Sequence, residues 1–557
     1  MPYLVLTLAA AGLFALRVCA PQNLLDQDQE RPATYVLDVI QNGNWICQRD
    51  LTGDITSKPP LWTWLSALAS LAAGQATVFT LYLPGAAAAW GTAVMVFYAG
   101  KKHFGERAAW LAAIALLFTS ATLKEFGLAR TDGVFACAVT AAALLGFRAW
   151  RLGRGWTAFW VAAALATLAK GPLGVLLAGA GLLACAWERR SGSAAPLRGS
   201  QWLGLALFLG ITGGWFGLSC WRFGYPVVEK MLGKELMGHA GSGGTGRYPG
   251  MLFYQQPLYY LGRAGPWSLA ALLGLWRVWR LTAPSVNASA EAMMTRRFRR
   301  FLFCWFLFGL VIFSLAPHQR ADLLWPILPA GALLAGLELA RLTAGVRGSA
   351  LAWWTTLALG AGTAGFGCYY FQLRPRSEVG VQSIAVKRVA EEVRARGGAQ
   401  FPLTHVDDPA AFQFFLGTLR SPVSFARAAE LLRGPEAAFV AVGRLSSLER
   451  ERREGDPAWH VFRLATNSPV VLVGNRRELG AYDSFSLGIG PLVVRSRGAR
   501  LERATERTLS FAPSAAIPQV VITNEGATPR RVQVCGLGAL PLERLMGPGE
   551  VWRVNNP

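Results

Sequence analysis

Long apolar segments recur through the first two thirds of this sequence, and they constrain the fold more than any other feature. Segments of roughly 15 to 22 residues are long enough to cross the ~30 Å of hydrocarbon in a bilayer. The chain has 557 residues, a mean hydropathy of +0.32, 21 tryptophans and 30 phenylalanines. A chain this apolar is expected to bury much of its surface in lipid, so we predict a polytopic α-helical membrane protein.

The first apolar segment, residues 2–20, has neither the basic start nor the small-residue cleavage site of a signal peptide. We therefore expect a retained first helix. The further candidate spans are residues 79–98, 108–121, 133–146, 156–187, 203–220, 266–276, 301–315, 323–340 and 351–370. If the sequence LAKGPLG breaks 156–187 into two spans, the chain crosses the membrane about eleven times.

The charges of the connecting loops predict the orientation. Alternate loops share one side and hold roughly 17 Lys and Arg against about 3 acids, an asymmetry expected of cytoplasmic loops. The opposite side is then the outer side of the membrane. Because so many basic residues flank apolar spans, membrane topology also accounts for much of the formal charge of +22, and we expect no nucleic-acid partner.

The composition changes near residue 372. We assign residues 1–371 to a transmembrane domain with outer loops at 21–77 and 221–265. Residues 372–478 alternate an amphipathic helix with short apolar runs, which predicts an α/β domain on the outer side. Residues 479–557 contain strand-like runs separated by Gly, Asn and Pro, and we expect a β-rich, sandwich-like C-terminal domain there.

The first outer loop concentrates charge. It reads DQERPATYVLDVIQNGNWICQRDLTGDITSKPPLWTWL from Asp28 onward. If this stretch is helical, Asp28 and Arg31 share one face, and Lys58 follows thirty residues later at a Pro-Pro turn. The alternative to a functional site is a solvated loop with an ion pair, since exposed charges are common and contribute little to stability.

These residues resemble a known family. The first loop, followed in order by LARTDGVFACAV, LAKGPLGVLL, a long loop ending in GPWSL, and FSLAPHQRADLLWPILPA, is similar to bacterial C-type glycosyltransferases related to the lipid A aminoarabinose transferase and to protein O-mannosyltransferases. The resemblance covers about residues 1–340. It implies the fold of that class, with about 11–13 transmembrane helices. It also implies a bacterial inner membrane, with the active site and the C-terminal domains on the periplasmic side.

The resemblance also implies a reaction: inverting transfer of a sugar from a polyprenyl-phosphate donor to a lipid A-like or other periplasmic acceptor, without a cofactor. An acceptor hydroxyl benefits from a nearby carboxylate acting as general base. Asp28 is the expected carboxylate. Asp132 matches the second acidic position of the family and is expected to face the same cavity.

A phosphate leaving group needs fixed cations. We expect Arg31, Lys58, Arg320 and Arg130 to bind the donor phosphate, since arginine offers a planar fork and lysine a point charge. The alternative for Arg320 is a snorkelling charge at the membrane boundary, and for Arg130 an ion pair with the nearby Asp132.

Another lysine, Lys170, lies at a helix break, and we leave it outside the site as a structural residue.

Two positions depart from the family pattern where relatives can hold a metal. Ser57 stands where an acid is often found, and Leu236 stands where the long loop is expected to carry a histidine, although His239 follows three residues on. We therefore expect no metal. The eight cysteines show no paired spacing, so neither a disulfide framework nor a zinc site is predicted.

Three alternatives remain open. The enzyme could glycosylate protein, as the O-mannosyltransferases do. A transporter is also polytopic and has charges within the membrane, but the sequence lacks the paired halves typical of that class. A membrane-anchored binding protein would explain the C-terminal domain but not the ordered motifs of the outer loops.

Overall fold

The computed structural model describes residues 2–26, 28–190, 196–231, 233, 250–281, 289–317, 319–505, 507–515, 517–538 and 540–554. The chain divides into two compact units. We call Met1–Ala20, Ile55–Ala69 and Phe79–Tyr370 the helical unit, and Pro21–Asp54, Ser70–Val78 and Phe371–Pro557 the mixed unit.

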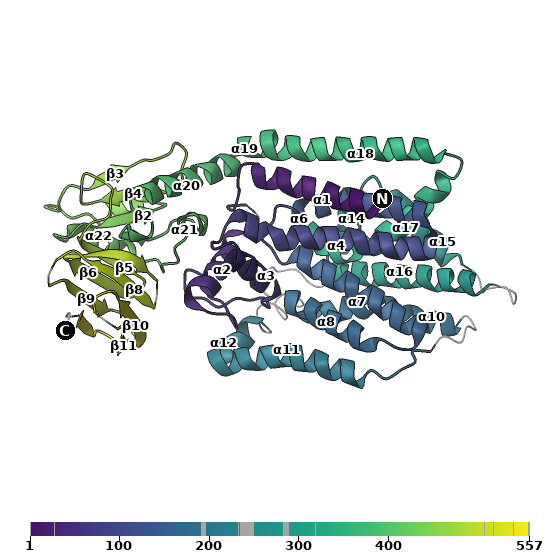
Figure 1. Cartoon of the computed structure of the whole chain (residues 1–557), viewed down its shortest axis with the longest axis horizontal. Coiled ribbons are helices and arrows are strands. Elements are labelled where there is room, and N and C mark those ends of the chain that lie inside the picture. Colours follow the sequence, from purple (N-terminus) through teal and green to yellow (C-terminus); the bar gives the residue numbers. More distant parts are fainter. Residues whose placement is uncertain are drawn as a thin grey trace. The chain divides into compact units, whose positions relative to one another are not determined.

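The helical unit is a bundle of long helices that run side by side (Figure 1). Its principal elements are α1 (Pro2–Cys19), α3 (Leu61–Ala72), α4 (Val78–Phe104), α5 (Glu106–Leu117), α6 (Ser120–Glu125), α7 (Asp132–Leu152), α8 (Trp156–Lys170), α9 (Leu173–Ala180), α10 (Ala184–Arg190), α11 (Trp202–Phe223), α12 (Tyr225–Val228), α14 (Gln255–Arg263), α15 (Ser268–Trp279), α16 (Ala290–Leu315), η3 (Ala321–Ile327), α17 (Leu328–Leu342) and α18 (Gly348–Cys368). Every apolar segment predicted from the sequence coincides with one or more of these helices.

Six helical segments in the described part of the chain are long and apolar enough to cross a membrane. They are Pro2–Cys19, Val78–Phe104, Asp132–Leu152, Trp202–Phe223, Ala290–Leu315 and Ala321–Leu342. Three shorter apolar helices, α3, α8 and α15, accompany them. The polytopic helical fold expected from the sequence is therefore confirmed, and the chain is a multi-pass membrane protein.

The predicted break at LAKGPLG separates α8 from α9. Gly171 has φ +83°, a left-handed conformation that favours glycine, and its amide donates to the Thr167 carbonyl to close α8. Pro172 then has no amide hydrogen to continue the helical ladder. As a result α8 ends at Lys170, and the lysine side chain lies at the end of a helix.

The mixed unit contains a small α/β layer. Its helices are α20 (Glu378–Ala395), α21 (Ala410–Leu416), α22 (Phe425–Arg433) and α23 (Leu445–Glu449). Its sheet has the order β1-β2-β4-β3, formed by β1 (Leu403–His405), β2 (Phe439–Val442), β4 (Val471–Gly474) and β3 (His460–Phe462). Strands β1 and β2 are parallel, and the other two pairs are antiparallel.

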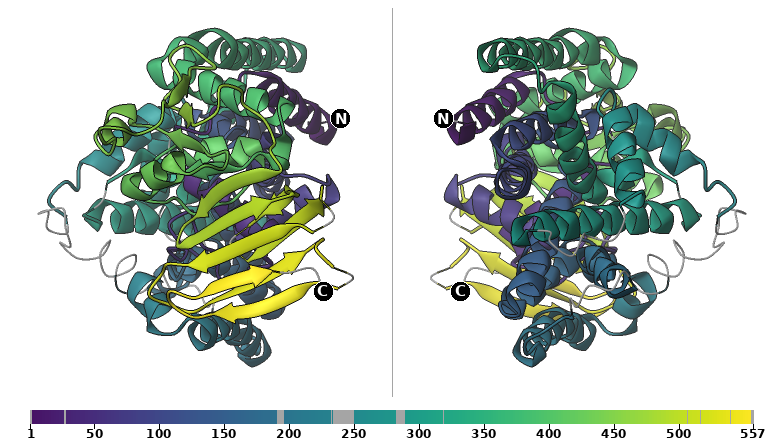
Figure 2. Two further views of the ribbon diagram at one scale, coloured as in Figure 1. Left: turned by 90° about the vertical axis from the view of Figure 1, so that its left-hand side faces the viewer. Right: turned by 90° about the vertical axis from the view of Figure 1, so that its right-hand side faces the viewer.

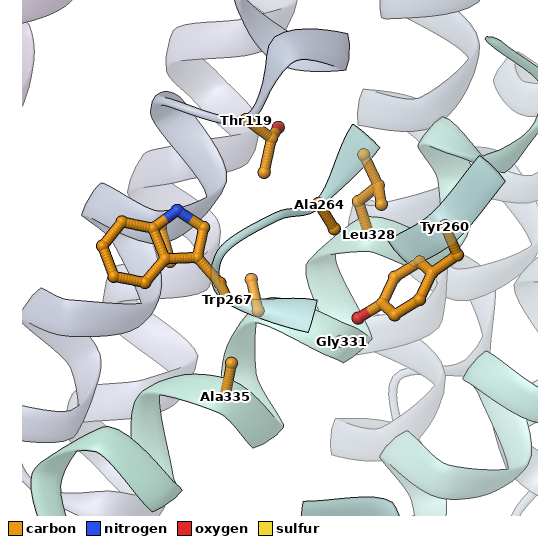
Figure 3. A pocket seen from close by; sticks show the side chains of 9 residues that line it. Thr119, Tyr260, Ala264, Trp267, Leu328, Gly331 and Ala335 are labelled. Atoms are coloured by element: carbon orange, nitrogen blue, oxygen red, sulfur yellow. The ribbon is translucent and has the colours of Figure 1, made fainter. Parts of the chain in front are cut away.

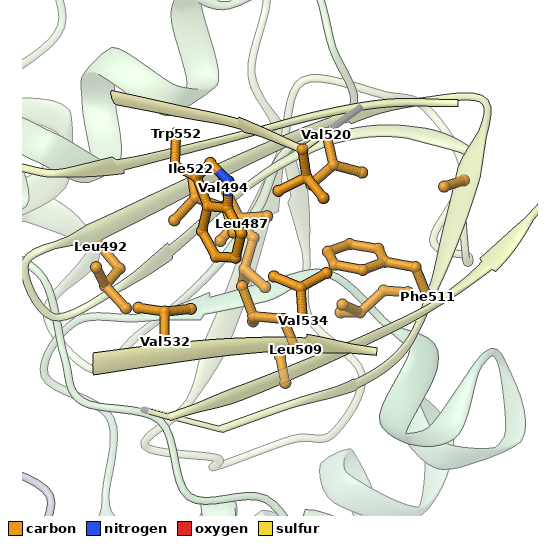
Figure 4. Packing of buried hydrophobic residues seen from close by; sticks show 14 of the residues in the cluster. Leu487, Leu492, Val494, Leu509, Phe511, Val520, Ile522, Val532, Val534 and Trp552 are labelled. Atoms are coloured by element: carbon orange, nitrogen blue, oxygen red, sulfur yellow. The ribbon is translucent and has the colours of Figure 1, made fainter. Parts of the chain in front are cut away.

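The last part of the chain forms two further four-stranded sheets, seen among the yellow strands of Figure 2. One has the order β11-β10-β8-β7, from Leu542–Met546, Arg530–Cys535, Thr508–Pro513 and Ala499–Ala504. The other has the order β12-β9-β6-β5, from Val551–Val554, Gln519–Asn524, Leu492–Arg497 and Ser484–Ile489. Alternate side chains of both sheets, among them Leu487, Leu509 and Phe511, share one buried apolar core (Figure 4). This pattern confirms the sandwich-like C-terminal region.

The first outer loop contains a helix that packs within the mixed unit. Helix α2 (Glu30–Asn42) is amphipathic and packs beside α21 within the mixed unit (Figure 1). The Glu30 carboxylate accepts a hydrogen bond from the Ala411 amide at 2.9 Å, and the Gln41 side-chain amide donates to the Gly417 carbonyl at 2.8 Å. Asp26 and Arg374 form an ion pair. Residues 21–54 therefore fold with the C-terminal part of the chain.

Candidate functional site

Six ionisable side chains gather where several elements of the helical unit end, and we call them the charged cluster. They come from the end of α6, the turn before α7, the first residue of α7, the last residue of α8, and η3. The members are Lys124, Glu125, Arg130, Asp132, Lys170 and Asp322.

Asp132 is the centre of this cluster. Its carboxylate pairs with the Lys170 ammonium and lies 3.3 Å from an Arg130 guanidinium nitrogen. Arg130 also lies 3.6 Å from the Asp322 carboxylate, which Lys124 approaches to 3.5 Å. Since Asp132 is almost fully buried, these cations replace the water that would otherwise stabilise its charge.

Local folding places these groups. Asp132 begins α7, where the unsatisfied amides of the first turn favour a negative charge. Lys170 is in the last turn of α8, where the helix dipole favours a positive charge. Thr119 caps the start of α6 through its hydroxyl, which accepts from the Thr122 amide at 3.4 Å. The cap fixes the short helix that carries Lys124 and Glu125.

Glu125 is buried beside Asp132. Its Oε2 atom has no hydrogen-bond partner in the described part of the chain. A Cβ atom added at Gly133 would lie 2.6 Å from that oxygen, so a glycine leaves room for the carboxyl group. Burial, and then the neighbouring Asp132 charge, raise the pKa of Glu125 to about 8. Near neutral pH this group is mostly a neutral carboxylic acid.

The cluster therefore carries an excess of positive charge. Three cations, Lys124, Arg130 and Lys170, face two carboxylates while Glu125 is protonated. The charge of Lys58 also acts on Asp132. A surplus of fixed cations suits a phosphate group.

Lys58 and Arg320 both belong to the helical unit. The Lys58 backbone closes a small turn with the Thr56 hydroxyl, at 3.1 and 3.2 Å, just before α3 begins at Leu61. The Arg320 carbonyl accepts a hydrogen bond from the buried Gln256 amide at 3.2 Å, immediately before η3. Both side chains are half-buried.

Asp28 and Arg31 belong to the mixed unit. Asp28 is exposed and has φ +56°, a left-handed conformation that is unfavourable for most non-glycine residues but tolerated by aspartate. Helix α2 begins only at Glu30. The expectation that Asp28 and Arg31 share a helical face is therefore wrong, because the chain turns at Asp28 before the helix starts.

Arg31 is held by two carboxylates that the sequence interpretation did not include. Its Nε donates to Asp50 at 2.8 Å, and its Nη2 lies 3.2 Å from Asp54. Asp50 is itself fixed, since its other oxygen accepts from the amides of Thr52 and Asp54, each at 3.0 Å. These contacts orient Arg31 and also compete with any phosphate for its guanidinium.

The structure thus brings together Arg130 and Asp132 and adds Lys170, which the sequence interpretation had left out of the site. It also adds Lys124, Glu125 and Asp322. The spacing of Arg130 and Asp132 was visible in the sequence, but Lys170 lies 38 positions from Asp132, and Asp322 lies 192 positions from Arg130.

A metal centre was not expected, and the part of the chain that the structure describes contains no group of three or more His, Cys, Asp or Glu side chains arranged to hold a metal ion. Ser57 is described, whereas Leu236 and His239, on which that expectation also rested, lie outside the described residues.

A small pocket is lined by residues of α5, α14 and α17 and by residues just after α5 and just before α15, and it contains no ionisable group other than a tyrosine (Figure 3). The Tyr260 hydroxyl points toward Gly331, and the other labelled side chains are mainly apolar. This pocket is a packing gap between helices and offers none of the chemistry of the charged cluster.

Comparisons with known proteins agree with this picture. Residues 57–212 match the model of the dolichyl-phosphate-mannose-protein mannosyltransferase family. A protein of Aquifex aeolicus (strain VF5), described as uncharacterized, is 29% identical over 220 residues, which is 38% of this chain and 47% of that protein. The matched region thus spans less than half of that relative.

Two solved structures share the fold. ArnT from Cupriavidus metallidurans bound to undecaprenyl phosphate has a TM-score of 0.63 at 18% identity, covering 86% of this chain and 98% of that one. The apo state of the same protein also gives 0.63, at 17% identity and the same coverage. The resemblance found in the sequence is therefore confirmed: this chain is similar to the mannosyltransferase family over residues 57–212 and has the fold of a C-type glycosyltransferase over most of its length.

Proposed function

We propose that the chain is an integral-membrane glycosyltransferase that moves a sugar from a polyprenyl-phosphate donor to a lipid A-like or other periplasmic acceptor. The observation that carries this proposal is the surplus of cations in the charged cluster, at the ends of apolar helices. At the end of an apolar helix, the phosphate of a lipid-linked donor meets these cations while its lipid chain stays in the bilayer. The confirmed fold supports the same donor class, since the similar ArnT structure holds undecaprenyl phosphate.

In the proposed reaction Asp28 accepts the proton of the acceptor hydroxyl. The hydroxyl oxygen forms a bond to the anomeric carbon, and the bond from that carbon to the phosphate oxygen breaks. Attack from the face opposite the leaving group inverts the anomeric centre. Polyprenyl phosphate leaves with the bonding electrons, and fixed cations stabilise its charge.

We assign the donor phosphate to Lys58, Arg130 and Arg320, with Arg31 as a further cation. Lys170 is a positioning residue: its ion pair with Asp132 holds that carboxylate in place. Asp132 in turn orients Arg130. Asp132 is proposed as the second acidic residue of the site, and no cofactor takes part in the scheme.

Purified protein assayed with a polyprenyl-phosphate sugar and extracted envelope lipid tests the proposal. Asp28→Asn keeps the shape and hydrogen bonding of the side chain but removes the base, so transfer should fall by roughly 100-fold or more. Asp483→Asn, at an exposed carboxylate of the same unit, is the matched control and should transfer normally. Normal turnover by folded Asp28→Asn protein would show that the acidic stretch is a solvated loop.

A protein acceptor is the second candidate, because the matching family model describes protein mannosyltransferases. The two candidates give different products. Comparing the lipids and the glycoproteins of a deletion strain with those of its parent shows which class loses its sugar. A strain in which both are unchanged, but uptake of a solute is altered, would favour a transporter.

A further inference from the structure

A second basic site lies where α15 and α17 end and α16 begins. We call it the Arg299 cluster; its members are Arg277, Arg299, Glu338 and Arg341. Glu338 is fully buried and pairs with Arg277 and, at 2.6 Å, with Arg341. Arg299 is 9% exposed, and the charges that act on it are those of Arg341, Glu338 and Arg277.

Arg299 is not neutralised by these neighbours. Within the described ranges of the chain it forms no ion pair within 4 Å, and its Nε atom is buried without a hydrogen-bond partner. The Glu338 carboxylate already pairs with Arg277 and Arg341. The residues that join α15 to α16 and lie outside the described part, 282–288, contain no Asp or Glu in the sequence. The cluster therefore has three positive charges and one negative charge.

A neighbouring group on the same helix shows a different arrangement. Arg300 donates to the buried Glu188 at 2.9 Å, and Arg296 approaches the same carboxylate at 3.9 Å. The Arg300 guanidinium also lies over the Trp187 ring, 4.5 Å from its centroid. Each of these two arginines has a carboxylate within 4 Å, whereas Arg299, one residue before Arg300, has none among the described residues. A buried cation in that situation is costly unless an anion joins it.

The residues near the Arg299 cluster indicate which kind of anion it binds. Trp276 and Trp279 are exposed on the last turn of α15, and the Arg280 guanidinium lies 5.5 Å from the Trp276 ring centroid. Exposed tryptophans beside arginines are typical of the boundary between headgroups and acyl chains. Arg277 and Arg341 are each about two-fifths exposed, so a group at this boundary can reach them.

We propose that the Arg299 cluster binds the phosphate of an anionic phospholipid, with the acyl chains against the exposed tryptophans of α15. The planar guanidinium group of arginine can donate two parallel hydrogen bonds to phosphate oxygens. Basic pockets between membrane helices bind the headgroups of anionic lipids. The site is separate from the proposed transferase chemistry. On the orientation predicted from the loop charges, it faces the cytoplasmic leaflet.

The test measures the thermal stability of the full-length protein in neutral detergent during titration with phosphatidylglycerol, phosphatidylcholine or inorganic phosphate. Phosphatidylglycerol should raise the melting temperature, and the other two should not. Arg299→Gln should weaken the apparent affinity for phosphatidylglycerol by roughly tenfold, about 1.4 kcal/mol. Without lipid, Arg299→Gln should melt at the same or a higher temperature, because it removes an uncompensated buried charge.

Arg189→Gln is the matched control, since Arg189 is an exposed arginine on α10, and it should respond like the wild type. If Arg299→Gln does not fold, Arg277→Gln at a partly exposed position should show the same loss. An equal response of the wild type and Arg299→Gln to phosphatidylglycerol would overturn the proposal. A matching stabilisation by inorganic phosphate alone would overturn the assignment to lipid.

Discussion

Lys170, in the last turn of α8, forms an ion pair with Asp132, the first residue of α7. The two residues are 38 positions apart, yet the pair joins the break at Gly171 to the turn that carries Arg130. The LAKGPLG motif therefore does more than end a helix, because it also contains Lys170, whose ammonium group pairs with the Asp132 carboxylate.

Removing this lysine should destabilise the protein. Lys170→Met removes the ion pair that Lys170 forms with Asp132, and we expect a loss of about 2 kcal/mol or more in the free energy of unfolding. Lys124→Met is the control, since Lys124 is more exposed and lies 3.5 Å from Asp322; its loss should be smaller. The double variant Asp132→Asn/Lys170→Met should be more stable than the sum of the single changes predicts. Additive losses would show that the pair contributes no coupling energy.

Glu125 should make stability depend on pH. Its pKa is raised from 4.5 to about 8 in the folded protein, so between these values the folded state holds a proton that the unfolded state has lost. The contribution of Glu125 to the free energy of unfolding therefore decreases as pH rises from about 4.5 to 8, by at most about 1.4 kcal/mol per pH unit.

Melting curves of the wild type and Glu125→Gln across this pH range measure that slope. As pH rises, the melting temperature of Glu125→Gln should increase relative to that of the wild type. Glu291→Gln, at an exposed position of α16, should follow the wild type. Parallel curves for the wild type and Glu125→Gln would contradict the raised pKa.

The carboxylates around Arg31 give a third prediction. If Arg31 binds donor phosphate, Asp54 competes for it, and Asp54→Asn should lower the KM for the donor by roughly two- to fivefold, the scale of one exposed ion pair. The kcat should change little. Glu550→Gln, which removes a carboxylate from the β-rich region, serves as the control. An unchanged or higher KM in Asp54→Asn would remove Arg31 from the set of phosphate cations.

A fourth prediction concerns the C-terminal region. A chain ending at Tyr370 lacks Arg374, Ala411 and Gly417, which contact α2 and the turn before it. Limited proteolysis of this truncated protein should cut within residues 21–54 much faster than in the full-length protein. Protection equal to that of the full chain would mean that α2 is stable without these contacts.

The sequence predicts much of the fold because a membrane-spanning chain requires long apolar segments. Each apolar segment predicted from the sequence is helical in the structure. It also predicts the β-rich end, where alternation along Leu492–Arg497 places apolar side chains in one core. The first loop was harder to interpret. Helix α2 is amphipathic and too polar to stand out beside apolar spans, and its partner α21 is far away in the sequence.

The candidate site was only partly visible in the sequence for a related reason. Arg130 and Asp132 are close in the chain, so their pairing could be anticipated. Asp322 and Lys124 are 198 positions apart, and no local pattern connects them. The sequence analysis did not single out Glu125, because the burial of this residue depends on how α6 and α7 pack.

The contacts of α2 also set an order of events during synthesis. The segment that carries Asp28 leaves the ribosome early, but the residues that contact it are separated from it by 348 to 381 positions. At typical translation rates these arrive roughly 20 to 75 seconds later. Until then the segment lacks its packing partners, so in a nascent chain that stops before residue 374 it cannot form the contacts it has in the full-length protein.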